Sequence, residues 1–153
     1  MKKAKPYIFS ILLALTIGGL SALSIAKNMN IYDKINPPPL APAGWLFPVV
    51  WTVLFTLMGI SAALVFTSKS KKKDDALFIY AVSLVLNFSW SIFFFNLLSF
   101  IVSFIILVAL WLSIIITIIK YYPINKAAAW LQLPYLLWVT FAGYLNFAII
   151  LLN

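Results

Sequence analysis

The run ALFIYAVSLVLNFSWSIFFFNLLSFIVSFIILVALWLSIIITII, residues 76–119, contains no charged side chain. A helix that crosses a hydrocarbon core of roughly 30 Å needs about 20 apolar residues. The run is about twice that long, so it predicts two membrane-spanning helices joined by a tight turn. The most turn-like segment within it is Asn96-Leu97-Leu98-Ser99. We therefore predict that the chain reverses direction at this segment.

Three further uncharged runs, residues 6–26, 35–68 and 127–153, are each long enough for one membrane-spanning helix. Charged side chains make up 9% of the sequence and hydrophobic ones 65%, whereas a soluble domain has roughly 25% charged residues. Helices are expected, because the alternation and turn punctuation of membrane strands are missing. The prediction is an all-α membrane protein, one five-transmembrane-helix bundle over residues 1–153, with spans near 7–26, 45–67, 76–96, 99–119 and 128–151.

The eleven basic residues are all lysines, and they divide unevenly between the two sides of such a bundle. The side that holds the N-terminus receives nine of them, and the other side receives only Lys27 and Lys34. Cytoplasmic loops of membrane proteins carry the excess of positive charge. The N-terminus is therefore predicted to be cytoplasmic and the C-terminus external, in a cell membrane whose anionic headgroups the lysines contact.

The first span has a second interpretation, because lysines followed by an apolar stretch also begin a secretory signal peptide. The apolar stretch here is about 20 residues, longer than the usual 7–15 of a signal peptide, so a retained span is favoured. Small residues recur at every fourth position, a spacing that lets helices approach closely in lipid: Ala14, Gly18, Ala22 and Ala26. Gly59 and Ala63 repeat this spacing in the second span. The candidate dimer surfaces are the small ridge of the first span, the third span, and the Gly59–Ala63 ridge as a further option.

Missing residue types exclude whole classes of chemistry. The sequence contains no His, Cys, Arg or Glu, and its acids, Asp33, Asp74 and Asp75, fall in predicted loops. This excludes metal sites built from His, Cys and carboxylate ligands, histidine-activated nucleophiles and paired-carboxylate catalysis. The spans lack the ionisable residue that ion-coupled transport usually requires. Nucleic-acid binding is not expected, since there is no basic face with interleaved aromatics, and no resident cofactor is expected.

Four of the six tryptophans lie inside the predicted spans, although tryptophan prefers the membrane interfaces. At a rise of about 1.5 Å per residue, Trp51, Trp90 and Trp138 fall in the outer half of the membrane, and Trp111 falls deeper, where packing or lipid contact explains it. Helical spacing groups further residues with them: Phe55, Asn87, Tyr135, Ala142 and Asn146. Spacing leaves two interpretations open, an aromatic core with interhelical hydrogen bonds or a ligand pocket.

The longest predicted loop, residues 27–44, lies above this half of the membrane. It contains Tyr32, Pro37-Pro38-Pro39, Pro42 and Gly44. Prolines fix the backbone and remove hydrogen-bond donors, so the loop is expected to be extended and semi-rigid. It is either a stiff connector or a lid over a cavity.

Several of these residues form motifs that resemble those of the TspO/MBR family of translocator proteins and tryptophan-rich sensory proteins. The motifs keep one register from Tyr32 to Asn146, and they are Pro38 with Pro42, Gly44-Trp45, Pro48-Val49-Val50-Trp51-Thr52, Met58-Gly59, Asn87-Phe88-Ser89-Trp90 and Leu133-Pro134-Tyr135-Leu136-Leu137-Trp138-Val139. Two positions depart from the family pattern: Leu40 stands where a tryptophan is common, and Ala43 where a second proline is. The sterol pattern of the animal members is not supported, because no basic residue follows Tyr144.

The resemblance implies a five-helix bundle, usually a homodimer, with a pocket that opens toward the first long loop. It implies porphyrins such as protoporphyrin IX, and other flat hydrophobic molecules, as ligands. Together with the positions placed by depth and spacing, it gives these candidate ligand-binding residues: Tyr32, Pro42, Phe47, Trp51, Phe55, Asn87, Trp90, Tyr135, Trp138, Ala142 and Asn146.

Three functions follow from such a pocket. The first is a membrane binding protein or sensor for porphyrins. The second is light-dependent oxidative breakdown of bound porphyrin, in which Trp51 and Trp138 take part and the porphyrin is a substrate. The third is passive transport of the hydrophobic ligand, since ion coupling is not supported.

Overall fold

The computed structural model describes residues 4–153, with the side chain of Tyr32 outside the description. Within this part the chain is helical, without strands, and its elements are α1 (Lys5–Ile25), η1 (Ala26–Asp33), α2 (Leu46–Phe66), α3 (Lys73–Ser91), η2 (Ile92–Asn96), α4 (Phe100–Tyr121), α5 (Lys126–Leu131) and α6 (Leu133–Leu152). Five helical segments are long and apolar enough to cross a membrane: Lys5–Ile31, Leu46–Phe66, Lys73–Asn96, Phe100–Tyr121 and Lys126–Leu152. The prediction of an all-α membrane protein with five spanning helices is confirmed.

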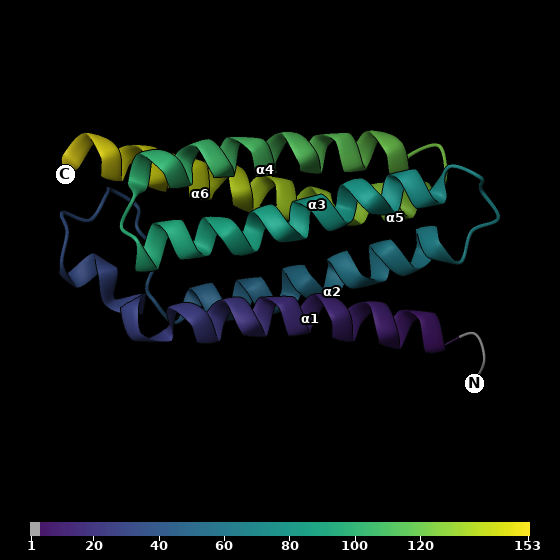
Figure 1. Ribbon diagram of the computed structural model, residues 1–153, viewed down its shortest axis with the longest axis horizontal. Coiled ribbons are helices and arrows are strands. Elements are labelled where there is room, and N and C mark those ends of the chain that lie inside the picture. Colours follow the sequence, from purple (N-terminus) through teal and green to yellow (C-terminus); the bar gives the residue numbers. More distant parts are fainter. Residues whose placement is uncertain (1–3) are drawn as a thin grey trace.

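The five segments run along one common direction, and the two chain ends lie at opposite ends of the bundle (Figure 1). One end, here called the loop end, carries η1, the long loop after it, the turn before α4 and the C-terminus. The opposite end carries the α2–α3 and α4–α5 connections, with an ion pair between Lys120 and Asp75. Large apolar side chains such as Phe9, Leu23 and Ile105 are exposed on the outside of the bundle, as the surface of a membrane-embedded bundle requires.

Small residues bring α1 and α2 into close contact. A Cβ atom added to Gly59 of α2 would lie 2.5 Å from the Cα atom of Ile11 in α1. A Cβ atom on Gly18 would lie 2.5 Å from the ring of Phe55, and Ala14 is fully buried. These small residues are therefore occupied by packing within one chain, and neither ridge is free to serve as a dimer surface along its whole length.

The chain reverses between α3 and α4 at the predicted turn. The last residues of the third span widen into the π-helix η2, and Leu98 takes a left-handed conformation with φ of 50° before α4 begins. Asn96 fixes the turn to the first span, because its side-chain nitrogen donates to the carbonyl of Ser24 (3.0 Å) and its oxygen accepts from Asn28 (2.9 Å). Short π-helical segments of this kind often lie at functional sites.

The fifth span is broken into α5 and α6 at Gln132. Pro134, in the first turn of α6, has no N–H to continue the hydrogen bonds of α5, so the helix restarts there. The Gln132 side chain is buried and donates to the hydroxyl of Ser61 (3.0 Å), which in turn donates to the carbonyl of Ala128 (2.7 Å). The buried Gln132 amide at this break thus has its hydrogen-bond partner in α2.

Candidate functional site

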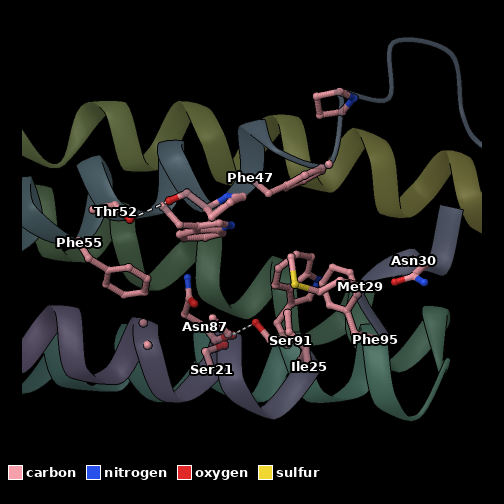
Figure 2. Close-up of a pocket in the computed structure, with 18 of the residues that line it drawn as sticks. Ser21, Ile25, Met29, Asn30, Phe47, Thr52, Phe55, Asn87, Ser91 and Phe95 are labelled. Atoms are coloured by element: carbon pink, nitrogen blue, oxygen red, sulfur yellow. Dashed lines mark hydrogen bonds between the residues drawn. The ribbon is translucent and has the colours of Figure 1, made fainter. Parts of the chain in front are cut away.

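A cavity of about 810 Å³ lies at the loop end, between α1, α2 and the α3–η2 segment. Its volume falls in the range of roughly 300–1,000 Å³ that ligand pockets occupy. Figure 2 shows Phe47 and Thr52 on one side of it and Ser21 and Ile25 on the other. Its lining is Leu15, Gly18, Gly19, Ser21, Ala22, Ile25, Met29, Asn30, Asp33, Pro37, Ala41, Pro42, Gly44, Phe47, Pro48, Trp51, Thr52, Phe55, Asn87, Trp90, Ser91 and Phe95.

The α2 wall is aromatic because rings recur one helical turn apart. Trp51 and Phe55 lie four residues apart, with ring centroids 5.6 Å apart and planes inclined by 32°. Thr52 lies beside them, and its hydroxyl donates to the carbonyl of Pro48 (2.7 Å) rather than into the cavity. The wall therefore offers ring faces for stacking and few free polar groups.

The α3 wall carries Asn87 and Trp90, whose polar atoms form hydrogen bonds with side chains of α6. The Asn87 amide nitrogen donates to the hydroxyl of Tyr135 (2.9 Å), and Trp90 Nε1 donates to Asn146 Oδ1 (3.2 Å). All four side chains are buried. These two bonds fix the orientation of the wall, because each supplies the partner that a polar group at membrane depth needs.

The α6 residues lie behind this lining. The Trp138 ring meets the Trp51 ring edge-on, with centroids 6.4 Å apart, and meets Phe47 at 5.9 Å. Tyr135 contacts Trp51 edge-on at 6.2 Å and is fully buried. Ala142 and Asn146 are buried as well. The fifth span thus supports the rings of the pocket and does not line it.

The predicted residues therefore separate into three groups. Six of them line the cavity: Pro42, Phe47, Trp51, Phe55, Asn87 and Trp90. Four lie outside the lining, in the core or packed against it: Tyr135, Trp138, Ala142 and Asn146. The side chain of Tyr32 lies outside the described residues.

The α1 wall was missed by sequence reasoning. It consists of Leu15, Gly18, Gly19, Ser21, Ala22 and Ile25. None of these side chains carries distinctive chemistry, and their four-residue spacing indicated only close helix contact. Gly19, next to this ridge, leaves space, because nothing lies within 4 Å of a Cβ atom placed on it. The small-residue ridge was the one signal that could have located this wall.

The rim at the loop end is formed by η1 and the long loop. The loop is tied to the end of α6, because the Tyr144 hydroxyl donates to the carbonyl of Pro39 (2.9 Å) and the Asn36 N–H donates to Asn153 Oδ1 (3.0 Å). Leu40, at the position where the family commonly has tryptophan, is 80% exposed, with φ of 66°. Residues of this segment that line the cavity are Met29, Asn30, Asp33, Pro37, Ala41, Pro42 and Gly44.

The arrangement suits binding by shape and stacking. Between residues 4 and 153 no group of His, Cys, Asp or Glu side chains is placed to hold a metal ion. Trp111 lies away from the cavity, in a shallow groove between α4 and α6, where its indole nitrogen donates to the hydroxyl of Thr140 (2.8 Å). It therefore provides a reference tryptophan outside the pocket.

Comparison with known proteins agrees with the motifs. The model of the TspO/MBR family matches residues 10–152. The chain is 40% identical to the tryptophan-rich protein TspO of Chlorobaculum tepidum over 124 residues, which is 80% of this chain and 78% of that protein. It is 36% identical to protein CrtK of Rhodobacter capsulatus over 80% of this chain and 78% of that protein. It is also 36% identical to the tryptophan-rich protein TspO of Archaeoglobus fulgidus, over 95% of both chains. The chain is thus a multi-pass integral membrane protein that belongs to the TspO/MBR family.

Proposed function

We propose that this protein is a membrane binding protein or sensor for flat hydrophobic molecules, with porphyrins of the protoporphyrin IX type as the first candidates. One observation carries the proposal: a cavity of about 810 Å³ whose walls present Trp51, Phe55 and Trp90. A planar ring seated there stacks on these faces, and each aromatic pair contributes about 0.5–1.5 kcal/mol beyond the burial of apolar area. Added to the burial of the apolar surface of the ring, at roughly 25 cal/mol per Å², several such contacts are expected to reach the roughly 8 kcal/mol of micromolar affinity.

The proposal includes the setting of the pocket. The lysine bias supports a cell membrane with the N-terminus in the cytoplasm, which puts the loop end and its cavity on the external side. A homodimer is proposed from the family resemblance, with its interface formed by surfaces other than the α1–α2 contact. Ligand then reaches the pocket from the outer leaflet or the external solution.

Replacing Trp51 with alanine is expected to weaken protoporphyrin binding at least tenfold. The variant removes the stacking face that lines the cavity and also the edge contacts of that ring with Tyr135 and Trp138. The measurement is a titration of purified protein with protoporphyrin, followed by porphyrin absorbance and by quenching of tryptophan fluorescence.

The matched control is Trp111→Ala, which removes an indole from the groove between α4 and α6. It should keep the affinity of the original protein within about twofold, since the side chain does not line the cavity. Equal affinities in the Trp51 and Trp111 variants would place the porphyrin elsewhere and end the proposal.

A second function, photo-oxidative breakdown of the bound porphyrin, is favoured by the contact between two indoles. Trp51 lines the cavity, and Trp138 stands edge-on behind it at 6.4 Å, so an indole next to the pigment has a second indole beside it. In this reaction the excited porphyrin takes an electron from the lining indole and passes it to dioxygen, which becomes superoxide. The indole radical cation then regains an electron from the porphyrin. The porphyrin radical cation and superoxide combine, so that one dioxygen is added to one porphyrin overall.

Illumination in air is expected to bleach bound protoporphyrin several times faster than the pigment in detergent alone. The double variant Trp51→Phe/Trp138→Phe, compared at equal occupancy, should bleach at the detergent rate, because phenyl rings are far poorer electron donors. The measurement is the decay of the main absorption band, with an anaerobic sample as control. Equal decay with and without the original protein would remove the enzymatic function and leave binding intact.

A further inference from the structure

Part of the cavity lining is exposed on the outside of the bundle. The α3 wall is buried, as at Asn87, whereas four lining residues of the first two spans are exposed: Gly19 and Ala22 in α1, and Pro48 and Thr52 in α2. The two helices lie side by side (Figure 1), so these four residues border one stretch of the cavity between them. A lining residue that is also exposed marks a place where the cavity reaches the surface, and we call this place the α1–α2 gap.

The α1–α2 gap faces lipid. Leu23, one helical turn from Gly19, is 75% exposed, and Val49, about one turn from Thr52, is 53% exposed. Large apolar side chains on the outside of a spanning helix contact acyl chains. At a rise of about 1.5 Å per residue, Gly19 lies about 9 Å from the end of α1 and Thr52 about 9 Å from the start of α2. The gap therefore opens at the depth of the acyl chains, below the loop that forms the rim.

The edges of the gap suit the passage of an apolar molecule. Gly19 has no side chain to fill the space, and nothing lies within 4 Å of a Cβ atom placed on it. On the other edge, the Thr52 hydroxyl donates to the carbonyl of Pro48 (2.7 Å), and Pro48 has no backbone N–H. These polar groups are thus already paired within α2, so an apolar molecule in the gap deprives none of them of a partner.

Toward the opposite end of the bundle, helix contact closes the gap. A Cβ atom on Gly18 would lie 2.5 Å from the Phe55 ring, and one on Gly59 would lie 2.5 Å from the Cα atom of Ile11. Trp51 lies one turn of α2 on the loop side of Phe55, and both rings line the cavity. A molecule that passes through the gap therefore reaches the ring faces of the α2 wall.

We propose that the α1–α2 gap is a lateral opening through which the cavity takes up apolar molecules dissolved in the adjacent membrane leaflet. The acyl chain of a phospholipid fits the same opening, because it is apolar and lies at the same depth. The inference deepens the proposed binding function and rests on it for the identity of the ligand. A porphyrin then reaches Trp51 without leaving the membrane.

The opening itself is tested with a phospholipid that carries a diazirine in the middle of one acyl chain. The protein is placed in bilayers that contain this lipid, illumination converts the diazirine to a carbene, and labelled residues are identified by mass spectrometry. Labels are expected on Trp51 and Phe55, which line the cavity, and on the exposed Leu23, whose label is the reference for lipid contact. A protein labelled at Leu23 but at neither ring overturns the opening.

Three variants locate the entry. Gly19→Phe narrows the gap and Gly44→Phe narrows the rim; both glycines line the cavity and have nothing within 4 Å of an added Cβ atom. Gly19→Phe should lower the Phe55 label about fivefold or more relative to the Leu23 label, and Gly44→Phe should lower it far less. Leu20→Phe places the same ring on the lipid face of α1, outside the lining, and should leave the label ratio unchanged. An equal loss in the two glycine variants would assign the entry to the rim and overturn the proposal.

Entry of a ligand is tested with the dimethyl ester of protoporphyrin, a neutral porphyrin that stays in the bilayer. Protein in bicelles is mixed with bicelles that carry the ester, and association and dissociation are followed by quenching of tryptophan fluorescence. A narrowed opening raises the barrier in both directions, so Gly19→Phe should lower both rates about fivefold and change the dissociation constant less than about twofold. Weaker binding through faster dissociation alone would overturn the entry route, because it indicates a damaged pocket.

The outcomes keep the two proposals apart. If the lipid labels Phe55 in a manner that depends on Gly19, while neither protoporphyrin nor its ester binds, the opening stands and the proposed function is wrong. If porphyrin binds and Gly19→Phe changes neither its rates nor the Phe55 label, the binding function stands and the lateral opening is wrong.

Discussion

Replacing Gly59 with leucine is expected to detach α1 from α2 and to lower the stability of the protein by at least about 3 kcal/mol. A Cβ atom at this position would lie 2.5 Å from the Cα atom of Ile11, 2.9 Å from its nitrogen and 3.0 Å from the carbonyl oxygen of Ser10. All three atoms belong to the backbone of α1, so no side-chain rotation relieves the clash. Overpacking usually costs about 1–3 kcal/mol, and a clash with a helix backbone falls at or above the upper end.

The measurement is the midpoint of thermal unfolding in detergent, read as the loss of the monodisperse peak in size-exclusion chromatography. Gly59→Ala gives a graded second variant, since it adds only the clashing Cβ atom and should lower the midpoint by less than Gly59→Leu. The matched control is Gly19→Leu in α1, where nothing lies within 4 Å of an added Cβ atom. A Gly59→Leu variant as stable as this control would show that the two helices are not in close contact at Gly59.

The same contact determines whether a pocket exists. Toward the loop end from Gly59, Gly18 of α1 lies against the ring of Phe55 in α2, and both of these residues line the cavity. Contact at Gly59 therefore sets the spacing of the α1 and α2 walls above it. A shift of α1 should reduce porphyrin affinity together with stability, so the two measurements on Gly59→Ala are expected to change in the same direction.

The number and type of the helices followed from the sequence because the bilayer imposes a length on each span. The run from residue 76 to residue 119 could only cross twice, and the chain does reverse between Asn96 and Phe100. The π-turn of η2 had no such signal, since its sequence Ile-Phe-Phe-Phe-Asn suits an ordinary helix. Its geometry follows from tertiary contacts, among them the bonds of Asn96 to the first span.

The pocket could be predicted only in part, because helical spacing tells which residues share a face but not what that face meets. Trp51 and Trp90 face the cavity. Tyr135 and Asn146 share a face of α6 that instead packs against residues of α2, α3 and α4. A cavity and a hydrogen-bonded aromatic core are thus both present and occupy successive layers, while ligand binding in the cavity stays a prediction. The α1 wall was not predicted for a different reason. Glycine and alanine contribute to a cavity because their side chains are small, and small side chains give no signal of a ligand contact.

Replacing Asn146 with leucine is the second change with a large expected effect, about 2 kcal/mol of stability together with a severalfold loss of porphyrin affinity. Asn146 joins three spans: its Oδ1 atom accepts from Trp90 Nε1 (3.2 Å) and from the Ser103 hydroxyl (3.0 Å), and its nitrogen donates to the carbonyl of Phe100 (3.0 Å). Interhelical hydrogen bonds in membrane proteins contribute about 0.6 kcal/mol each on average and about 1.7 kcal/mol at most.

The three bonds are not equally replaceable. The Ser103 hydroxyl also lies 2.9 Å from the carbonyl of Phe100, so after the substitution it can donate there instead. Trp90 Nε1 has its hydrogen-bond acceptor in Asn146 and is left buried without one, which costs about 1–3 kcal/mol. Most of the lost stability should therefore come from the unsatisfied nitrogen of Trp90. The indole that lines the pocket should also lose its fixed orientation.

A double-mutant cycle tests this assignment. In the background Trp90→Phe, which has no indole nitrogen to satisfy, Asn146→Leu should cost less than half of what it costs in the original protein. Thr140→Val serves as the matched control, because it removes the acceptor of an indole bond at the half-buried Trp111 and should change stability by less than about 0.5 kcal/mol. Equal costs of Asn146→Leu in the two backgrounds would mean that the Trp90–Asn146 bond does not stabilise the protein, and the proposed support of the pocket wall by α6 would then fail.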